Sequence, residues 1–457
     1  MEERPRADGF THPYLGLTPA ERAEMLSFIG VSDADQLFDD IPETWRPEAL
    51  PQPLSERELF QEALRLASRN LSATGRPFFL GGTSHQHYLP AAAQKLVERG
   101  EFLTSYTPYQ PEISQGMLQA IFEYQSMIAE LTGLDTVNAS HYTYGTCLGE
   151  AAYMAHRLNG RKRVVVCGAV NPERLEILRT YCFGADMEVL QSQPNEQSGE
   201  LELAEASSLI SEEASLVYAE SPNYFGILEP RLSELAELAH EKGALFCQGF
   251  DLISLALVKP PRENGADIAV GEGVGFPMSF GGPGLGIFAT KREHVRAAPG
   301  RLVGATVDAN KRRGYVITLQ TREQHIRREK ATSNITTNSS INALANAAYL
   351  ALLGTSGLRN TAQVILSNTR YVQKEIAKVG SVVAPAFSGT SYQDFSFRFM
   401  GDGRKLVEAF KRRGVVGPVA SKIRVSGAGQ LYLGAVTELT TIEHVEELRS
   451  SLEEASD

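Results

Sequence analysis

The stretch from Gly265 to Lys291 combines residue types that usually surround a bound cofactor. Seven glycines lie from Gly271 to Gly286, and the apolar runs beside them, Ile268–Val270 and Leu285–Ala289, are predicted strands. Such a loop permits positive φ and lets the backbone approach a ligand or another segment closely. Yet no Lys, His, Cys or Asp occurs between Glu272 and Gly284. The stretch therefore has the frame of a cofactor site but lacks a reactive group.

Three common site motifs are not supported by the sequence. There is no GxxxxGK[ST] sequence, which excludes a P-loop. The glycine-rich run Gly282–Gly286 enters a predicted strand, whereas the dinucleotide fingerprint leaves a strand and opens a helix, so a nicotinamide site is unsupported. The GxSxG elbow of a serine hydrolase is also missing.

A pyridoxal phosphate architecture fits better. It needs a phosphate cradle at a helix N-terminus, a carboxylate for the pyridine nitrogen and a Schiff-base lysine. Thr143, Gly145 and Thr146 supply hydroxyls and amides where a helix is predicted to begin, and Asp251 follows the predicted strand Ala244–Cys247. These four residues form the candidate cofactor pocket. For Asp251, a relic of the pyridine partner and an ordinary helix N-cap or turn residue are equal alternatives.

The Schiff-base lysine is missing from the place where it is expected. The positions there are Glu272 to Gly275, and none of them can form an imine. Lys259 precedes the next predicted strand and Lys291 follows the one after, so both are poorly placed. We therefore expect no catalytic residue and no covalently bound cofactor in this chain.

Composition limits the class of protein. With 457 residues and 42% hydrophobic residues the chain can bury large cores, and its net charge of −11 argues against nucleic acid as a partner. No apolar run reaches the ~18 residues of a membrane span, and the N-terminus shows no signal peptide. The four cysteines show no CxxC spacing, and His85 and His87 have no third ligand nearby, so no metal is expected. We predict a cytoplasmic protein.

The elements predict three regions. Residues 1–80 are expected to form a helical arm, with helices beginning after Thr18 and Ser55. Residues 81–335 alternate apolar strands with helices, which predicts a large α/β domain with a mainly parallel sheet. Residues 336–457 are expected to form a smaller α+β domain that contains a half-buried strand at Tyr392–Phe399.

Four longer motifs carry a specific resemblance: Thr107–Gly116 (TPYQPEISQG), Phe122–Leu134 (FEYQSMIAELTGL), Pro299–Gly304 (PGRLVG) and Leu319–Ile335 (LQTREQHIRREKATSNI). Together they resemble the P-protein of the glycine cleavage system, and more narrowly subunit 1 (alpha) of two-chain glycine dehydrogenase (decarboxylating). The similarity covers nearly the whole chain and weakens before about residue 75 and in the C-terminal domain.

The resemblance implies an aminotransferase-like fold, that of the fold type I pyridoxal phosphate transferases, in an α2β2 assembly of two related chains. In that family the beta subunit carries the pyridoxal phosphate lysine, and the alpha subunit lacks it. The family reaction decarboxylates glycine and passes an aminomethyl group to the lipoyl arm of the H-protein.

Two residues depart from the family pattern. Tyr144 stands where the family's alpha chain usually has the Asp of an Asp-Gly pair, and Asn171 stands where it tends to have His before Pro172. A bulky Tyr would crowd a phosphate. The cradle is therefore expected to be vestigial, and a diverged paralogue with a different partner is the alternative.

Tyr106, Thr107, Tyr109 and Gln110 are the candidate contribution of this chain to a neighbouring active site. Prolines stiffen this polar, aromatic loop. We expect the four residues to reach across the heterodimer interface toward the partner's cofactor. Packing within the chain is the alternative.

Residues 311–330 form a basic passage with seven Lys and Arg residues. It is a candidate docking surface for the H-protein, although internal pairing with Glu323 and Glu329 is the simpler interpretation. Two other functional classes stay open. One is a diverged, stand-alone pyridoxal phosphate-dependent lyase that has recruited Lys259 or Lys291, and the other is a structural or regulatory pseudoenzyme subunit.

Overall fold

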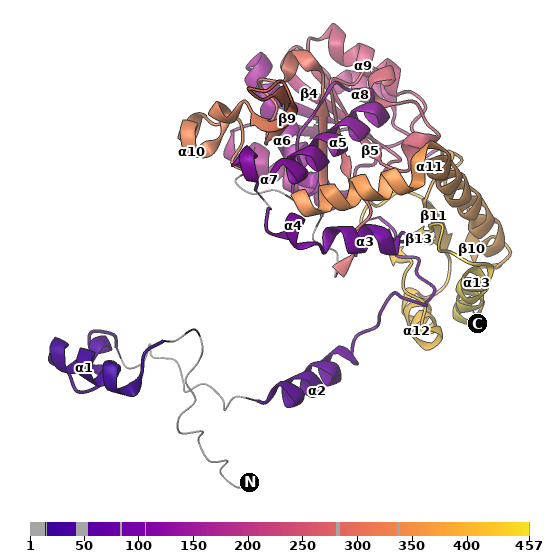
Figure 1. Cartoon of the computed structure of the whole chain (residues 1–457). Coiled ribbons are helices and arrows are strands. Elements are labelled where there is room, and N and C mark those ends of the chain that lie inside the picture. The colour runs from indigo at the N-terminus through magenta and orange to yellow at the C-terminus, as the bar shows by residue number, and fades with distance from the viewer. Residues whose placement is uncertain are drawn as a thin grey trace. The chain divides into compact units, whose positions relative to one another are not determined.

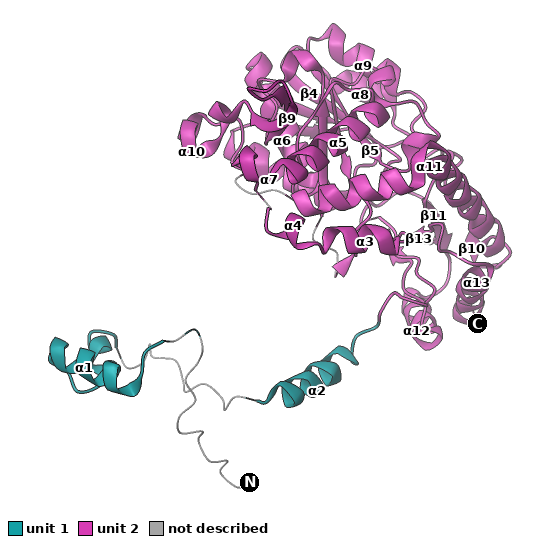
Figure 2. Ribbon diagram, in the orientation of Figure 1, with its two compact units in different colours: residues 1–71 teal, residues 72–457 magenta. Residues whose placement is uncertain are grey.

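The structure is a computed structural model that describes residues 14, 16–42, 54–82, 85–105, 107–279, 284–335 and 339–456. The chain divides into two compact units, residues 1–71 and 72–457 (Figure 2). Each unit is described by itself.

The first unit contains the helices α1 (Pro19–Ile29) and α2 (Glu56–Ala67) and the short 3-10 helix η1 (Ala34–Phe38). Thr18 and Ser55 cap the two α-helices, and each forms a capping box with a glutamate three residues later. The two helix starts predicted from the sequence are thereby confirmed. No residue of α1 or α2 is buried.

The second unit is built on a sheet that has seven strands among the described residues, in the order β1-β7-β6-β5-β4-β2-β3 (Figure 1). The strands β2 to β6 run parallel, whereas β7 pairs antiparallel with β6 and with β1. Their bounds are β1 Thr136–Val137, β2 Arg163–Val166, β3 Glu188–Gln191, β4 Ala214–Ser221, β5 Leu245–Asp251, β6 Ile268–Glu272 and β7 Gly286–Thr290. The predicted, mainly parallel sheet is confirmed.

Helices cover both faces of this sheet. Leu216 and Tyr218 of β4 pack with α6 and α7, while the alternate residues Val217 and Ala219 pack with α8 and α9. Burial on both faces explains why the strands read as continuous apolar runs. The helices of this region are α3 Ala91–Val97, α4 Gly100–Leu103, α5 Gln115–Thr132, α6 Tyr144–Asn159, α7 Pro172–Gly184, α8 Leu203–Leu209, α9 Leu232–Glu241 and α10 Gln324–Arg327.

A smaller antiparallel sheet with the strand order β10-β11-β13-β12 forms the C-terminal part. Its elements are β10 Val382–Val383, β11 Asp394–Phe399, α12 Gly403–Arg413, β12 Val419–Ala420, β13 Gln430–Ala435 and α13 Ile442–Ser456. Phe78 and Leu80 form isolated bridges to Val416 and Gly434, so the chain just before residue 81 pairs with C-terminal residues. The domain boundaries at 80 and 335 stay a prediction.

The expectation of a half-buried β11 was wrong, because every residue of this strand is buried. Phe395, Phe397 and Phe399 lie in the core of the small domain, as the alternation indicated. The opposite face is covered as well. Ser396 Oγ donates to Phe225 O at 2.9 Å, so a polar side chain on this face contacts the large domain instead of solvent.

Helix α11 (Ser340–Ile376) joins the two sheets and breaks at Gly354. Tyr349 and Leu350 pack in the core beside α5, and Val372 and Ile376 pack in the core of the small domain. In the described part of the chain, α11 is the single helix long and apolar enough to span a membrane, but half of its most apolar window is buried inside the protein. This is the pattern of a core helix.

A two-stranded ribbon, β8 (Leu302–Val307) with β9 (Arg313–Thr318), packs on α5 through Val303, Tyr315 and Ile317. It precedes α10 and places the motif residues after Pro299 beside the loop that leads into α5.

Candidate functional site

Glu272, the last residue of β6, is the first of the four residues, Glu272 to Gly275, among which the Schiff-base lysine was expected. The N–H of Tyr144 donates to Glu272 Oε2 at 2.6 Å, and the N–H of Leu285 donates to Oε1 at 2.8 Å. Burial raises the pKa of the Glu272 carboxyl above its ordinary value, while these two hydrogen bonds oppose the shift. The carboxylate thus occupies the N-terminal end of α6, where the helix dipole favours an anion.

The three cradle candidates lie together at the start of α6, as predicted. Thr143 N donates to Thr146 Oγ1 at 3.0 Å and Thr146 N donates to Thr143 Oγ1 at 3.3 Å, which is a capping box. A Cβ on Gly145 would lie 2.5 Å from Ile177 Cδ1, so this glycine lets α6 pack closely on α7. The hydroxyls and amides of the cradle therefore serve the helix cap.

Tyr144 fills the space beside the cradle. Its side chain is buried, and the guanidinium carbon of Arg174 lies 3.8 Å from the centre of its ring. The hydroxyl oxygens of Tyr144 and Tyr218 lie 3.3 Å apart. A Cβ on Gly249 would lie 2.0 Å from Tyr144 Oη, so the tyrosine fits only because residue 249 is glycine.

An ion pair completes this cluster. Arg174 Nη1 lies 3.0 Å from a carboxylate oxygen of Glu220, whose side chain is fully buried in β4. Tyr218 Oη donates to the other Glu220 oxygen at 3.0 Å. The sequence analysis missed both residues, since Arg174 and Glu220 are distant in the sequence and belong to no recognised motif.

Asp251 and Asn171 both act as caps in the structure. Asp251 ends β5 next to Glu272 of β6 in the strand register, and its Oδ1 accepts from Ser254 N at 2.7 Å. This is the geometry of the turn-residue alternative. Asn171 caps α7 by accepting from Glu173 N at 2.9 Å, and its side-chain amide donates to Gly82 O.

The second candidate site is the loop before α5. Tyr106 lies outside the described residues. Tyr109 is 41% exposed, and its Oη accepts from Arg301 Nη2 and donates to Glu323 Oε2 at 3.1 Å. Gln110, which is also exposed, precedes the short 3-10 helix η3 (Pro111–Ile113), and Thr107 O accepts from Tyr109 N at 2.9 Å.

Comparison with known proteins settles the family. The family model of the glycine cleavage system P-protein matches residues 12–452. This chain belongs to that P-protein family. A "Probable glycine dehydrogenase (decarboxylating) subunit 1" of Pyrococcus horikoshii is 45% identical over 95% of this chain and 98% of its own length. A protein of the same name from Listeria innocua is 42% identical over 97% of this chain and 99% of its own length.

Solved structures agree with the predicted fold. A crystal structure of glycine decarboxylase (P-protein) of the glycine cleavage system, in inhibitor-bound form, superposes with a TM-score of 0.87 at 42% identity, over 97% of this chain and 100% of that one. A sphingosine-1-phosphate lyase from Burkholderia pseudomallei gives a TM-score of 0.65 at 14% identity over 90% of this chain and 93% of that one, and shows the fold alone. The aminotransferase-like, fold type I prediction is confirmed.

In this P-protein chain the pocket residues do not fit pyridoxal phosphate. No lysine lies from Glu272 to Gly275, the Glu272 carboxylate takes the anion position at α6, and a buried tyrosine fills the adjoining space. The two flanking lysines offer no substitute. Lys291 Nζ lies 2.5 Å from Asp267 at the opposite end of β6 from Glu272, and Lys259 is exposed. The recruited-lysine alternative therefore has no geometric support.

The loop motifs of the P-protein family meet in one cluster. Arg301 comes from the PGRLVG motif and Glu323 from the motif Leu319–Ile335, which contains α10, and both contact Tyr109. The His325 ring lies 6.2 Å from the Tyr109 ring. The sequence signal for Arg301, Glu323 and His325 was present in the motifs, but spacing alone did not indicate that they surround Tyr109.

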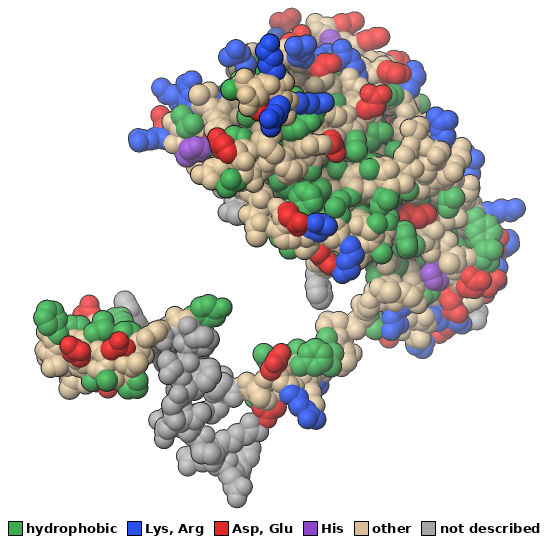
Figure 3. Space-filling view, viewed as in Figure 1, with side chains coloured by type: hydrophobic (Ala, Val, Ile, Leu, Met, Phe, Trp, Pro, Cys, Tyr) green, Lys and Arg blue, Asp and Glu red, His purple; other side chains and the backbone are tan. Residues whose placement is uncertain are grey.

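The basic passage is partly internal. The guanidinium of Arg322 donates to Ala298 O and to Gly300 O, and Arg313 lies over the rings of Phe122 and Tyr315. Six cations of the passage are exposed: Lys311, Arg312, Arg313, Arg327, Arg328 and Lys330. Figure 3 shows Lys and Arg side chains gathered at the α10 end of the second unit.

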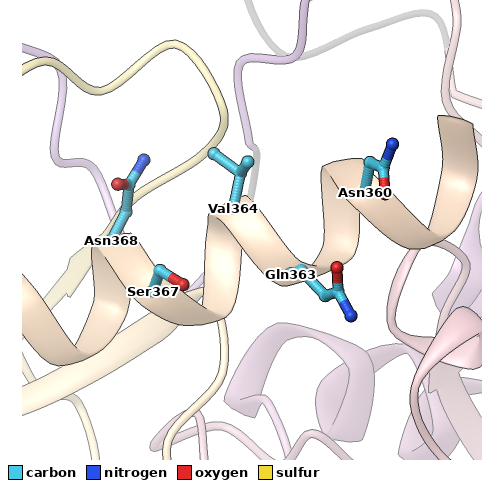
Figure 4. A pocket seen from close by; sticks show the side chains of 5 residues that line it. All are labelled: Asn360, Gln363, Val364, Ser367 and Asn368. Carbon is cyan, nitrogen blue, oxygen red and sulfur yellow. The ribbon is translucent and has the colours of Figure 1, made fainter.

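Two surface hollows lie away from the predicted site residues. One of about 350 Å³ is lined by one face of α11, from Asn360 to Asn368 (Figure 4). The other, of about 280 Å³, is lined by residues 73–86 and by the C-terminal segment that includes His444. Neither hollow is lined by any of the predicted site residues that the structure describes.

Proposed function

We propose that this chain is the subunit of a two-chain glycine dehydrogenase (decarboxylating) that does not bind pyridoxal phosphate. One observation carries the proposal: a chain similar over its length to proteins named subunit 1 has no lysine from Glu272 to Gly275, and the Glu272 carboxylate accepts the Tyr144 N–H at the start of α6. In this assignment a beta subunit carries the lysine and the cofactor. The pair decarboxylates glycine and transfers the aminomethyl group to the lipoyl arm of the H-protein.

The contribution of this chain to the chemistry is its loop at Thr107, Tyr109 and Gln110, together with Tyr106. In the partner, pyridoxal phosphate supplies the electron sink for decarboxylation. Arg301 and Glu323 fix the direction of Tyr109 Oη through charge-assisted hydrogen bonds. An exposed phenol held in this way can orient a substrate or cofactor group across the interface.

We further propose an α2β2 assembly that works in the cytoplasm, with neither nucleic acid nor membrane as a partner. The exposed cations between Lys311 and Lys330 are the docking candidate for the H-protein. A cationic surface on a chain whose net charge is −11 concentrates attraction for an acidic partner in one region.

Co-expression with the candidate beta chain tests the proposal. Glycine–CO2 exchange is measured in the presence of H-protein, with the beta chain alone, with this chain alone and with both. We expect exchange only when both chains are present. Equal exchange by the beta chain alone would instead favour a structural or regulatory subunit. Exchange or a visible imine absorbance in this chain alone would favour the stand-alone lyase.

A further inference from the structure

We propose that Glu272 is a built-in ligand for the anion-binding end of α6 and that Tyr144, Arg174 and Glu220 seal the space beside it. This chain is then closed to phosphate-bearing cofactors, and the closure is independent of the missing lysine. The inference rests on the proposed function in that it explains why the cofactor belongs to the partner.

The first argument is that both carboxylate oxygens of Glu272 already accept hydrogen bonds. Each carboxylate oxygen accepts a backbone N–H, from Tyr144 at 2.6 Å and from Leu285 at 2.8 Å. Both bonds are charge-assisted, and one comes from the first turn of α6. A carboxylate tethered to the end of β6 keeps these bonds without the loss of translational and rotational freedom that a dissolved anion incurs on binding. It therefore outcompetes a phosphate for the same N–H groups.

The second argument is that positive charge near the cradle is already neutralised. Arg174 is the cation nearest to the cradle residue Tyr144 in the described cluster, and it pairs with Glu220 at 3.0 Å while it stacks on the tyrosine ring at 3.8 Å. Tyr218 Oη donates to Glu220 as well. An incoming phosphate would have to compete with a buried carboxylate for this guanidinium.

The third argument is that glycines shape the chain around these groups. A Cβ on Gly284 would lie 2.5 Å from Glu272 Oε1, and a Cβ on Gly286 would lie 2.5 Å from Thr143 O. Gly249 makes room for Tyr144 Oη in the same way. Gly284 and Gly286 thus let the segment that leads into β7 pack closely on Glu272 and the start of α6.

Closure and a missing lysine predict different behaviour. If only the lysine were missing, the chain would still bind inorganic phosphate or pyridoxal phosphate without a covalent bond. If the pocket is closed, the wild-type chain binds neither inorganic phosphate nor pyridoxal phosphate. Glu272→Ala, which frees the N–H groups of Tyr144 and Leu285, opens an anion site.

The experiment measures the melting temperature of the full-length chain in phosphate, pyridoxal phosphate or chloride at equal ionic strength. We expect no ligand-dependent shift for wild type and for the exposed-site control Glu234→Ala. We expect Glu272→Ala to melt lower in chloride and to regain several degrees in phosphate (on the order of the gain that ligand binding produces at 100 times Kd). The comparison of the two ligands shows which part of pyridoxal phosphate is bound. A melting-temperature shift in pyridoxal phosphate but not in phosphate would mean that the pyridine ring is needed for binding.

A phosphate shift in wild type, or no shift in Glu272→Ala, would overturn the closure. Should Glu272→Ala fold poorly, recovery of folded chain from phosphate and chloride buffers is compared, and equal recovery contradicts the proposal. The proposed function fails separately, if the beta chain alone carries out glycine–CO2 exchange. If the wild-type chain binds phosphate but is still required for glycine–CO2 exchange, the proposed closure is wrong and the proposed function stands.

Discussion

At the scale of single residues, Tyr109 differs from most exposed tyrosines because its hydroxyl is held from two sides. Arg301 is only 7% exposed and donates to Tyr109 Oη, and Glu323 accepts from it. The phenol is therefore oriented before any partner arrives, which lowers the entropy cost of an interface contact. Intrachain packing alone would not require the ring of Tyr109 to remain 41% exposed.

We expect Tyr109→Phe to lower glycine–CO2 exchange of the assembled enzyme about tenfold, which corresponds to about 1.4 kcal/mol in the barrier. The ring remains, so the loss isolates the hydroxyl between Arg301 and Glu323. Tyr371→Phe, on the exposed side of α11, is the matched control and should leave exchange unchanged. Unaltered turnover and cofactor affinity in Tyr109→Phe would rule out the active-site role.

His141 makes stability depend on pH. It is 1% exposed, its Nε2 has no hydrogen-bond partner among the described residues, and burial lowers its pKa to about 3. Between that value and the ordinary pKa near 6.5, the unfolded chain binds the proton and the native chain does not. Stability is therefore fully present above about pH 6.5 and declines as the pH falls.

The expected loss from this histidine is about 1 kcal/mol between pH 6 and pH 5. Urea unfolding of wild type and His141→Gln at pH 5, 6 and 7.5 (roughly spanning the ordinary His pKa) measures it. The variant should show a shallower decline of the unfolding free energy with falling pH. Parallel profiles for the two proteins would mean that His141 does not stay neutral in the fold.

At the scale of elements, α11 is continuous in hydrogen bonding but not in direction. Gly354 has φ 58° and ψ −175°, a conformation that essentially only glycine adopts. No side chain or backbone atom lies within 4 Å of a Cβ built there, so the glycine is needed for its dihedral angles and not for space. The break lets one half of the helix pack on the large domain and the other half on the small sheet.

Gly354→Ala should reduce the free energy of unfolding by about 2 kcal/mol, because it forces an L-residue into a conformation it rarely adopts. Gly380→Ala is the matched control, since it also meets open space but has no left-handed φ, and it should change stability by less than about 0.5 kcal/mol. Stability is measured by urea unfolding. Equal losses of unfolding free energy in the two variants would show that an alanine at position 354 adopts the backbone conformation of the break without strain.

At the scale of the whole molecule, charge is unevenly distributed. The chain carries a net charge of −11, yet six exposed cations lie between Lys311 and Lys330. Arg313 lies over two aromatic rings and Arg322 donates to two backbone carbonyls, so these contacts differ from the predicted pairing with Glu323 and Glu329. The exposed part retains the charge that an acidic partner would recognise.

The double reversal Lys311→Glu with Arg312→Glu should weaken H-protein binding about tenfold at low salt and flatten its salt dependence. The control reverses Arg404 and Lys405, two exposed cations on α12. Binding is measured with the assembled two-chain enzyme over a range of ionic strength. An unchanged salt dependence in the first variant would exclude this surface as the docking site.

The local features of this protein could be predicted from the sequence. Thr18 and Ser55 start helices because their side chains cap the first turn, and that depends on residues only three positions apart. The apolar runs indicated the strands, the absence of lysine from Glu272 to Gly275 was visible directly, and the family motifs indicated the fold. Periodicity also identified the inward phenylalanines of β11, but not the second domain that covers its other face.

The tertiary structure alone decided what fills the pocket. Glu272 reaches the start of α6, 128 residues away in sequence, because β1, which precedes α6, and β6 run in the same direction on either side of β7. The carboxyl end of β6 and the N-terminus of α6 therefore meet at one edge of the sheet. Which strands are neighbours is not encoded in any local pattern. For the same reason, only the fold shows that the Arg174–Glu220 ion pair lies against Tyr144. Only the fold shows, too, that Arg301 and Glu323 form hydrogen bonds with the Tyr109 hydroxyl. The sequence determined that a lysine is missing, and long-range packing determined that its place is occupied.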